Sequence, residues 1–576
     1  MINVLRISVI VSAVLFAIAA QSNPLGATLT GRVSFEDSSP VEGAVVTALK
    51  SGASIAISVV SGRDGDYSFP AEKLGPGEYS LTVEATGYDL SSERHASIKA
   101  GAANRTDLVL KKTESLATQL NNAEWILSAP GTDDQKGAIL LCVSCHTYER
   151  VFTSKHNVAE FETVVTRMIG YAPGTIPLRP QVRPNTNYDH PERFEAVAKY
   201  LSGVNLSSRD TWPYPLKVLP RPEGRGTRII ITQYKLPRPD MQPHDVVLDK
   251  SGTPWYGDFG QQYLGRLNTK TGEIKEYPVP ENKVGQPLGM LDVEFDKENN
   301  LWVGMMLQDA IGKLNVGTGQ IQEFGAPGSE LTDDTLQIPM VAPENMQVDG
   351  KVWMDVVSTR GFHGVQRLEV ATGKFEMFDI FHDSGNQIGD GASIGEGSAA
   401  PARDFWGFKA VSSNTYDIAS DSNNSLYFSD FLDAVQARIG KVDSKTGKIE
   451  WFYMPTEHAR PRRISMDSKD QLWIAEFRGN KIAMFDTKTN HFLEWQLPPG
   501  TYPYDVMTDA NGDVWTSGEY TDRLIRLNPK TKEIVQYPLP RNTDVRRIWV
   551  DSSTRPVTVW IGSNHAATIL KLEPLD

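Results

Sequence analysis

The alternation of apolar and polar residues changes along the chain, and each pattern predicts a different kind of structure. Between residues 27 and 111 the apolar positions recur with a period of two, as in Thr28–Val33, and glycine-rich turns separate the runs. This pattern predicts an all-β domain. Between residues 113 and 205 the apolar positions have helical spacing, as in Val158–Met168, which predicts a small all-α domain. From residue 229 to residue 576 short apolar strands return.

The segment 229–576 repeats a unit of about 45 residues. Each unit contains an apolar strand, an acidic turn, a strand with a central aromatic residue, a third strand, and a turn into a fourth. Four short strands in each of seven units predict a seven-bladed β-propeller. The central aromatic residue recurs at Trp255, Trp302, Trp353, Tyr427, Trp473, Trp515 and Trp560.

Two repeats depart from this pattern. The unit that ends with Ile569–Leu572 has room for only three strands, and a segment similar to the missing fourth strand, Thr232–Pro237, precedes the first unit. Because an incomplete sheet would leave an exposed edge, we expect the early strand to complete the last blade. Another unit is lengthened by an insertion at about 381–410, which is rich in glycine and acidic residues.

The N-terminus has the features of a secretory signal. Arg6 precedes an apolar run and small residues near Ala20, so we expect residues 1–20 to be a cleaved signal peptide. The run is short for a bilayer span, so no membrane span is expected after cleavage. These features predict a bacterial protein of the periplasm or cell exterior. The proline-rich stretch 206–228 is predicted to be a linker.

Length and charge narrow the classes of partner. With 576 residues the chain is too long for one ordinary core, so the fold class is multidomain: β-sandwich, helical domain and propeller. A net charge of −13 argues against nucleic acid as a partner. A redox partner protein or a small-molecule substrate is expected instead, and the sequence does not determine the oligomeric state.

The two cysteines of the chain stand in one motif, Cys142-Val143-Ser144-Cys145-His146. The spacing C-x-x-C-H is the attachment signature of a c-type haem. In that interpretation Cys142 and Cys145 bond the haem covalently and His146 is an axial ligand of the iron. A redox dithiol or a plain disulfide is the alternative, but no βαβ context surrounds the motif. The sequence therefore predicts one haem c that transfers single electrons.

The second axial ligand and the haem propionates have several candidates. Met168 is the candidate thioether ligand, His156 and His190 are its rivals, and an open or water-ligated iron is a further alternative. Arg150 and Arg167 are candidate partners of the propionates, since guanidinium groups bind carboxylates with two hydrogen bonds.

Two segments resemble known domains. The order of turns and strands through Asp64–Phe69 and Leu74–Val83 resembles the carboxypeptidase regulatory-like domain, which implies a small immunoglobulin-like sandwich over 27–111. The helix pattern around the C-x-x-C-H motif resembles a class I cytochrome c, which implies a haem domain over 113–205.

The repeats resemble the virginiamycin B lyase (streptogramin lyase) family of seven-bladed propellers. The shared motif is similar to Ile-Gly-Arg-Ile and occurs, for example, at Ile311–Leu314 and Ile439–Val442. The resemblance implies a metal-dependent lyase in which a histidine opens an inner strand and a carboxylate closes the next strand. His244 and Asp258 keep this spacing, with aspartate in place of glutamate.

Further residues of the propeller mouth follow from the same resemblance. Glu476 keeps the carboxylate position, but Arg462 stands where its histidine partner would be, and His458 lies close to Arg462 in the sequence. The implied metal is Mg²⁺, held by His244, Asp258 and Glu476.

The sequence leaves three functions to compare. The favoured one is an exported c-type haem protein for one-electron transfer, an oxidoreductase whose propeller binds a substrate or a redox partner. The second is a metal-dependent carbon–oxygen lyase with an accessory cytochrome. The third is a non-catalytic binding scaffold.

Overall fold

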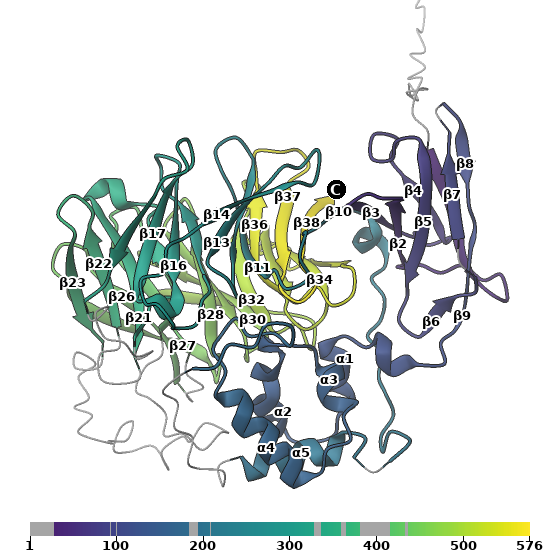
Figure 1. Ribbon diagram of the computed structural model, residues 1–576, viewed down its shortest axis with the longest axis horizontal. Helices are drawn as coiled ribbons and strands as arrows, with labels where there is room; N and C mark the ends of the chain where they lie inside the picture. Colours follow the sequence, from purple (N-terminus) through teal and green to yellow (C-terminus); the bar gives the residue numbers. More distant parts are fainter. Residues whose placement is uncertain are drawn as a thin grey trace, which may run out of the picture.

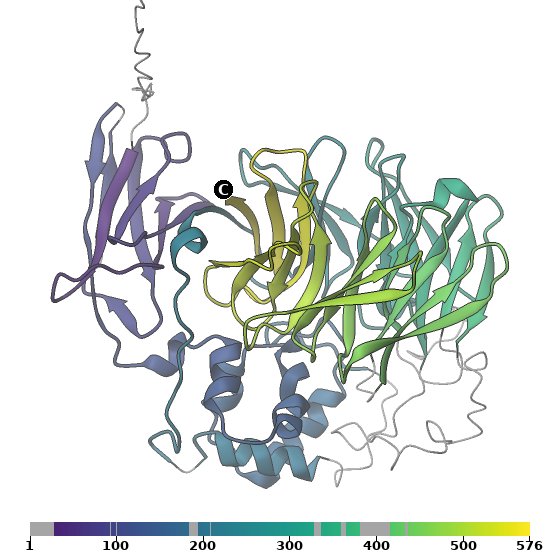
Figure 2. The same cartoon turned by 180° about the vertical axis from the view of Figure 1, so that it is seen from behind.

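The computed structural model describes residues 28–92, 94–99, 101–183, 194–207, 209–327, 336–358, 364–380, 415–431 and 436–576. These residues form a β-sandwich, a small helical unit and a ring of β-sheets, which are clearly separated in Figures 1 and 2. The predicted signal peptide, the predicted insertion at 381–410 and His190 lie outside the described residues. In the described part of the chain, no helix is both long and apolar enough to cross a membrane.

The N-terminal unit is the expected sandwich of two sheets. One sheet has the order β4-β1-β9-β6, with β8 paired to β1, and the other contains β3-β2-β5-β7. Strand β5 shows why the sequence alternates, because Tyr79 and Leu81 are buried in the core whereas Ser80 and Thr82 are exposed. The strands are β1 (Thr28–Phe35), β2 (Val45–Lys50), β3 (Ile55–Val60), β4 (Asp66–Phe69), β5 (Gly77–Glu84), β6 (Tyr88–Leu90), β7 (Arg94–Ile98), β8 (Ala103–Arg105) and β9 (Leu108–Lys112).

The following unit is helical, and its helices begin at capping boxes. Asn121 with Glu124, Thr132 with Gln135, and Asn157 with Glu160 satisfy the first free N–H groups of α1, α2 and α4. The apolar faces meet around the buried Trp125. The elements are η1 (Leu116–Gln119), α1 (Asn122–Ser128), α2 (Asp133–Ile139), η2 (Leu140–Ser144), α3 (Tyr148–Phe152), α4 (Val158–Ile169) and α5 (Glu195–Val204).

Seven consecutive antiparallel sheets, here blades 1 to 7, form the ring in the described residues. The inner strands of neighbouring blades contact each other around the whole circle, including blade 7 against blade 1. Blade 1 consists of β11 (Pro243–Leu248), β12 (Pro254–Asp258), β13 (Tyr263–Leu267) and β14 (Ile274–Pro278), and blade 2 of β15 (Val293–Phe295), β16 (Asn300–Met305), β17 (Ala310–Asn315) and β18 (Ile321–Gly325). Blade 3 consists of β19 (Leu336–Gln337), β20 (Val341–Ala342), β21 (Lys351–Ser358), β22 (Gly364–Glu369) and β23 (Lys374–Asp379). Blade 4 consists of β24 (Thr415–Ser420), β25 (Leu426–Asp430), β26 (Gln436–Val442) and β27 (Ile449–Glu457).

The repeating aromatic residue has a specific partner. In blades 1, 2, 5 and 6 the tryptophan indole N–H donates to the aspartate six residues earlier, as from Trp302 to Asp296 at 2.9 Å. This bond fixes the acidic turn between the first two strands of these four blades. Blades 5 to 7 are β28 (Pro461–Met466), β29 (Gln471–Glu476), β30 (Lys481–Asp486) and β31 (His491–Gln496); β32 (Pro503–Thr508), β33 (Val514–Gly518), β34 (Arg523–Leu527) and β35 (Ile534–Pro538); and β36 (Val545–Asp551), β37 (Thr558–Ser563), β38 (Thr568–Pro574) and β10 (Ile229–Lys235). Short 3₁₀ turns are η4 (Gly224–Thr227), η5 (Met306–Gln308) and η6 (Met346–Val348).

Strand β10 joins the propeller to the sandwich. It pairs with β38 over its whole length, which confirms that the early strand completes the last blade. Its other edge pairs with β3, so that one sheet runs β36-β37-β38-β10-β3-β2-β5-β7. Ile231 packs in the core of blade 7, whereas Ile230 packs in the core of the sandwich. The sequence did not indicate this second pairing.

The helical unit lies against the face of the ring on which the inner strands begin, here called the helical face (Figure 1). The N–H of Ala123 donates to the carbonyl of Tyr520 at 2.9 Å, and Arg478 pairs with Asp134 at 2.9 Å. The opposite surface of the ring, where the first two strands of each blade are connected, is here called the far face.

Candidate functional site

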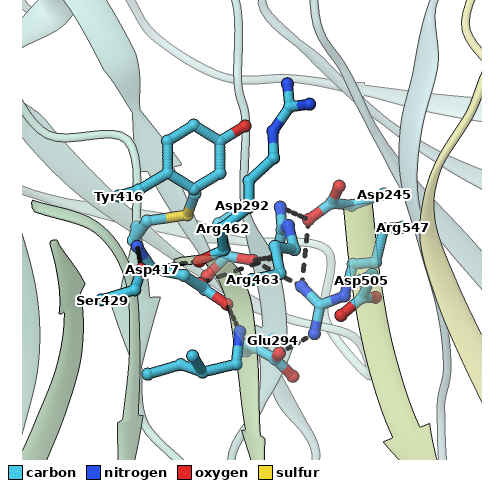
Figure 3. Close-up of polar contacts among 12 residues, drawn as sticks. Asp245, Asp292, Glu294, Tyr416, Asp417, Ser429, Arg462, Arg463, Asp505 and Arg547 are labelled. Carbon is cyan, nitrogen blue, oxygen red and sulfur yellow. Dashed lines mark hydrogen bonds and ion pairs between the residues drawn. The ribbon is translucent and has the colours of Figure 1, made fainter. Parts of the chain in front are cut away.

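The inner strands bring polar side chains to the axis of the ring. In the described residues five of the seven inner strands begin with a register shift, in blades 1, 4, 5, 6 and 7. A β-bulge re-aims the side chains around it, and Figure 3 shows the side chains near these starts converging. Two layers result. The mouth ring consists of His244, Tyr416, Arg462, Tyr504 and Arg546, and the channel ring consists of Asp245, Asp292, Asp417, Arg463, Asp505 and Arg547.

The aspartates of the channel ring connect neighbouring blades. A carboxylate oxygen of Asp417 accepts from the N–H of Ile464 at 2.8 Å, and Asp505 accepts from Ile548 at 3.0 Å. Asp292 accepts from the N–H of Val341 at 3.1 Å in the same way. Each bond satisfies a buried N–H of the next inner strand, so the carboxylates are held at the axis by the fold itself.

Two arginines replace aspartate in this layer and bind the acids across the channel (Figure 3). Arg463 contacts Asp245 at 2.7 Å and Asp292 at 3.1 Å. Arg547 contacts Asp245 at 3.0 Å, and also pairs with Asp292 and Glu294. All of these groups except Glu294 are at most 8% exposed. Breaking one such buried pair leaves an uncompensated charge and is strongly destabilising.

A cavity of about 340 Å³ opens beside the channel ring on the far face. Its wall includes the turn 467–470, which connects β28 to β29 at the end opposite Glu476 and the helical unit. Burial raises the pKa of Glu294 and of Asp417 to about 7. Burial, followed by the neighbouring Glu294, raises the pKa of Glu344 well above its usual range.

His244 and Asp258 meet at the same end of blade 1, as their spacing predicts, but other groups already bind them. His244 is 0% exposed, its Nδ1 contacts Asp245, and its Nε2 lies 3.2 Å from the Tyr504 hydroxyl. Burial lowers the pKa of His244 to about 3, so the ring is neutral. Asp258 accepts from the N–H of Gly260 at 3.0 Å, and burial raises its pKa to about 6.

The other predicted mouth residues do not join this pair. Arg462 binds Glu519 at 2.5 Å and stacks on the Tyr504 ring at 3.8 Å. Glu476 is buried near Glu494 instead, and burial together with that carboxylate raises the pKa of Glu476 to about 8. His458 is half-buried in the loop that follows β27. Only His244 and Arg462 belong to the mouth ring.

The C-x-x-C-H motif lies at the contact between the helical unit and blade 7. Cys142 is in the 3₁₀ turn η2, and the backbone carbonyl of Ser144 accepts from Arg546 at 3.0 Å. The hydroxyl of Tyr520 donates to the carbonyl of Leu140. Both thiols are unbonded and half-buried, and burial raises the pKa of Cys142 to about 12. The His146 Nδ1 lies 3.0 Å from the carbonyl of Thr147.

The remaining candidates lie on α3 and α4 or in the loop between them. His156 lies 3.7 Å from Glu160, with its ring against Phe161. Met168 is half-buried on α4, and Arg150 and Arg167 are exposed. The roles assigned to these residues from the sequence stay predictions.

The channel ring was missed at the level of sequence. Its signal is visible in hindsight, because an aspartate or arginine directly follows each residue of the mouth ring, as in His244-Asp245 and Arg462-Arg463. Nothing in one blade alone shows that these charges face one another across an axis.

Two family models match the chain. The carboxypeptidase regulatory-like domain matches residues 28–111, and the virginiamycin B lyase family matches residues 406–574. No curated protein matches. Similar solved structures include a virginiamycin B lyase from Staphylococcus aureus, with 20% identity, a TM-score of 0.46, and 60% of this chain and 99% of that chain covered. A streptogramin B lyase has 21% identity, a TM-score of 0.47, and coverage of 61% and 99%. A catalytically inactive S. aureus virginiamycin B lyase with quinupristin has 20% identity and a TM-score of 0.46, over 60% and 99%.

The prediction of haem c is contradicted. The families that match are a regulatory-like domain and a lyase family, and neither match extends over 113–205, so a cytochrome domain is not shown there. The turn that carries the motif packs on blades 6 and 7, where Tyr520 and Arg546, respectively, bind its backbone carbonyls. Electron transfer by a haem iron is unsupported as well.

The prediction of Mg²⁺ is also contradicted. No group of three or more His, Cys, Asp and Glu side chains that could hold a metal ion occurs within the described ranges. The physical reason is that His244 and Asp258 are bound by neighbouring groups, while Glu476 is buried near Glu494. What the comparisons and the fold do support is a chain that combines a carboxypeptidase regulatory-like domain with a virginiamycin B lyase-like propeller.

Proposed function

We propose that this protein is an exported binding protein, and that its lyase-like propeller serves as a scaffold that holds a small ligand in the channel cavity. One observation carries the proposal. The residues at the lyase-type position are buried on the helical face and bound by neighbours, whereas a cavity of about 340 Å³ is open on the far face. Cavities of this size are typical of small-molecule sites.

The state of His244 supports binding over lyase chemistry. A general base needs a free nitrogen within hydrogen-bond reach of the proton that it removes. Both ring nitrogens of His244 already contact protein groups, Asp245 on one side and Tyr504 on the other. Asp258 is bound by the N–H of Gly260, so neither member of the pair is available to a substrate.

The lyase alternative is tested with quinupristin, the compound present with the inactive S. aureus lyase. The full chain is incubated with quinupristin, and mass spectrometry follows the intact ring. We expect no ring opening above that of a His244→Ala variant. Ring opening that disappears in this variant would overturn the proposal in favour of a lyase.

Binding is tested by thermal unfolding of the full chain against small compounds grouped as cationic, neutral and anionic. A ligand present at a hundredfold its Kd stabilises the folded state by about 2.7 kcal/mol, which is a measurable shift of Tm. The shift should shrink in Glu344→Gln and persist in Glu450→Gln, a control on the exposed outer strand β27. If no group of compounds shifts Tm, the proposed function is wrong.

A further inference from the structure

The channel contains more acidic than basic groups. Arg463 and Arg547 are its two basic side chains among the described residues that line the cavity, and they bind Asp245, Asp292 and Glu294. Asp417, Asp505 and Glu344 also line the cavity, and Asp417 lies 3.8 Å from Arg463. Asp245, Asp292 and Glu294 alone provide three carboxylates against two guanidinium groups. The positive charge of the arginines is therefore already balanced before Asp417, Asp505 and Glu344 are counted.

Two polar atoms at the cavity wall have no partner. Oε2 of Glu344 is shielded from solvent and accepts no hydrogen bond, and Nε of Arg463, in a side chain 2% exposed, donates none. Buried polar groups are nearly always paired, so each exception calls for an explanation. A ligand that carries hydrogen-bond donors would satisfy Oε2 of Glu344, and a water molecule beside the ligand would accept from Nε of Arg463.

The titration behaviour agrees with a missing positive charge. Burial raises the pKa of Glu294 and Asp417 to about 7 and raises that of Glu344 well above its usual range, while the two arginines offset only part of this effect. Without a bound cation, protons therefore neutralise carboxylates that a cation would otherwise neutralise. A cation that enters must displace these protons.

We propose that the channel cavity binds a small organic cation with two or more ammonium or guanidinium groups, which enters from the far face. This inference rests on the proposed function and names its ligand class. A cavity of about 340 Å³ is far larger than one metal ion, and no group of three or more described His, Cys, Asp or Glu side chains has an arrangement that could hold one. An extended polyamine fits this volume, and its ammonium groups would face Asp417, Glu344 and Glu294, which line the wall.

The test is isothermal titration calorimetry of the full chain with spermidine at pH 7, in two buffers that differ in ionisation enthalpy. We expect one strong site and a net release of protons, because the bound cation favours the ionised carboxylates. Binding should be tighter at pH 8 than at pH 6 and weaker at high ionic strength. Citrate, an anion, should not bind.

Matched variants place the site. Glu344→Gln keeps the shape of the side chain and should weaken spermidine binding by about tenfold or more, as expected for one lost charge-assisted hydrogen bond. Glu344→Lys puts a cation into the cavity and should abolish both binding and proton release. Glu450→Gln should leave both unchanged.

The outcomes separate the two proposals. Spermidine binding without proton release, or with full affinity in Glu344→Gln, places the cation elsewhere and overturns this inference. If neutral or anionic compounds stabilise the chain through the cavity while spermidine does not, the ligand class is wrong and the binding function stands. If no compound binds, both are wrong.

Discussion

At the scale of residues, one side-chain position serves both the fold and the site. The carboxylates of Asp292, Asp417 and Asp505 each bind a backbone N–H of the next blade. The same groups face the cavity. Because the fold needs these carboxylates at the axis, an acidic channel results without further residues. Glu344 differs, since it accepts no bond through Oε2 and is free to serve a ligand.

Glu476 offers a prediction at the same scale. Burial and Glu494 raise its pKa from 4.5 to about 8, so the folded state retains a proton that the unfolded state loses. The stabilisation is therefore present at low pH and is lost as pH rises from about 4.5 to 8. Glu476→Gln mimics the protonated form. Its free energy of unfolding should exceed that of the wild type by an amount that grows, on the order of a few kcal/mol, between pH 5 and pH 9.

Urea unfolding at several pH values measures this difference. Glu457→Gln, at the exposed end of β27, is the control and should follow the wild type at every pH. Parallel curves for Glu476→Gln and wild type would show that Glu476 ionises in the folded protein as freely as in the unfolded chain, contrary to the prediction.

At the scale of elements, the local patterns of the sequence were sufficient for the blades but not for their partners. The tryptophan repeat marks the second strands because in blades 1, 2, 5 and 6 the indole binds an aspartate six residues earlier, which is a contact within one blade. The completion of blade 7 by β10 was predictable because the sequence of β10 is similar to that of the other outer strands. The pairing of β10 with β3 was not, because any exposed edge could have received a strand and no sequence pattern selects one.

The candidate site shows the same limit. The spacing of His244 and Asp258 correctly placed both residues at one end of blade 1. Spacing carries no information on what else contacts a side chain, and Tyr504, which approaches His244, is separated from it by 260 residues. The C-x-x-C-H motif likewise fixes a local turn, whereas its packing on blades 6 and 7 depends on Tyr520 and Arg546, far along the chain.

Strand β10 can be tested through two adjacent residues. Ile231 is fully buried in the core of blade 7, so Ile231→Ala should lower the free energy of unfolding by about 2–5 kcal/mol. Ile230 packs in the sandwich core, so Ile230→Ala should instead reduce hydrogen-exchange protection in β3. Val218→Ala, at a largely exposed site, is the control. If Ile231→Ala and Ile230→Ala each reduced hydrogen-exchange protection equally in blade 7 and in the sandwich, this division of roles would be contradicted.

At the scale of the whole molecule, the two smaller units attach to the propeller in different ways. The sandwich continues a β-sheet, so its attachment consists of a backbone ladder along β10 and β3. The helical unit attaches through side chains and loops. Gly174 illustrates how close the approach is, because a Cβ at this position would lie 2.0 Å from the carbonyl oxygen of Phe259, and its φ of +80° favours glycine. In the described residues the helical unit therefore packs closely on the helical face, whereas the cavity beside the channel ring opens on the far face.

Tyr520 is a buried side chain of the ring that contacts the helical unit. It is 1% exposed, packs with Tyr148 of the helical unit and donates its hydroxyl proton to the carbonyl of Leu140. Tyr520→Phe keeps the ring but leaves that carbonyl unpaired, at a cost of about 1–3 kcal/mol. Tyr520→Ala also removes the ring and should cost about 3–5 kcal/mol. Hydrogen exchange should therefore accelerate in residues 116–128 and 140–152 in the order wild type, Phe, Ala, while the exposed control Tyr453→Phe behaves as wild type. Unchanged exchange in the alanine variant would mean that other contacts hold the helical unit, since a unit fixed through Tyr520 must loosen when its ring is gone.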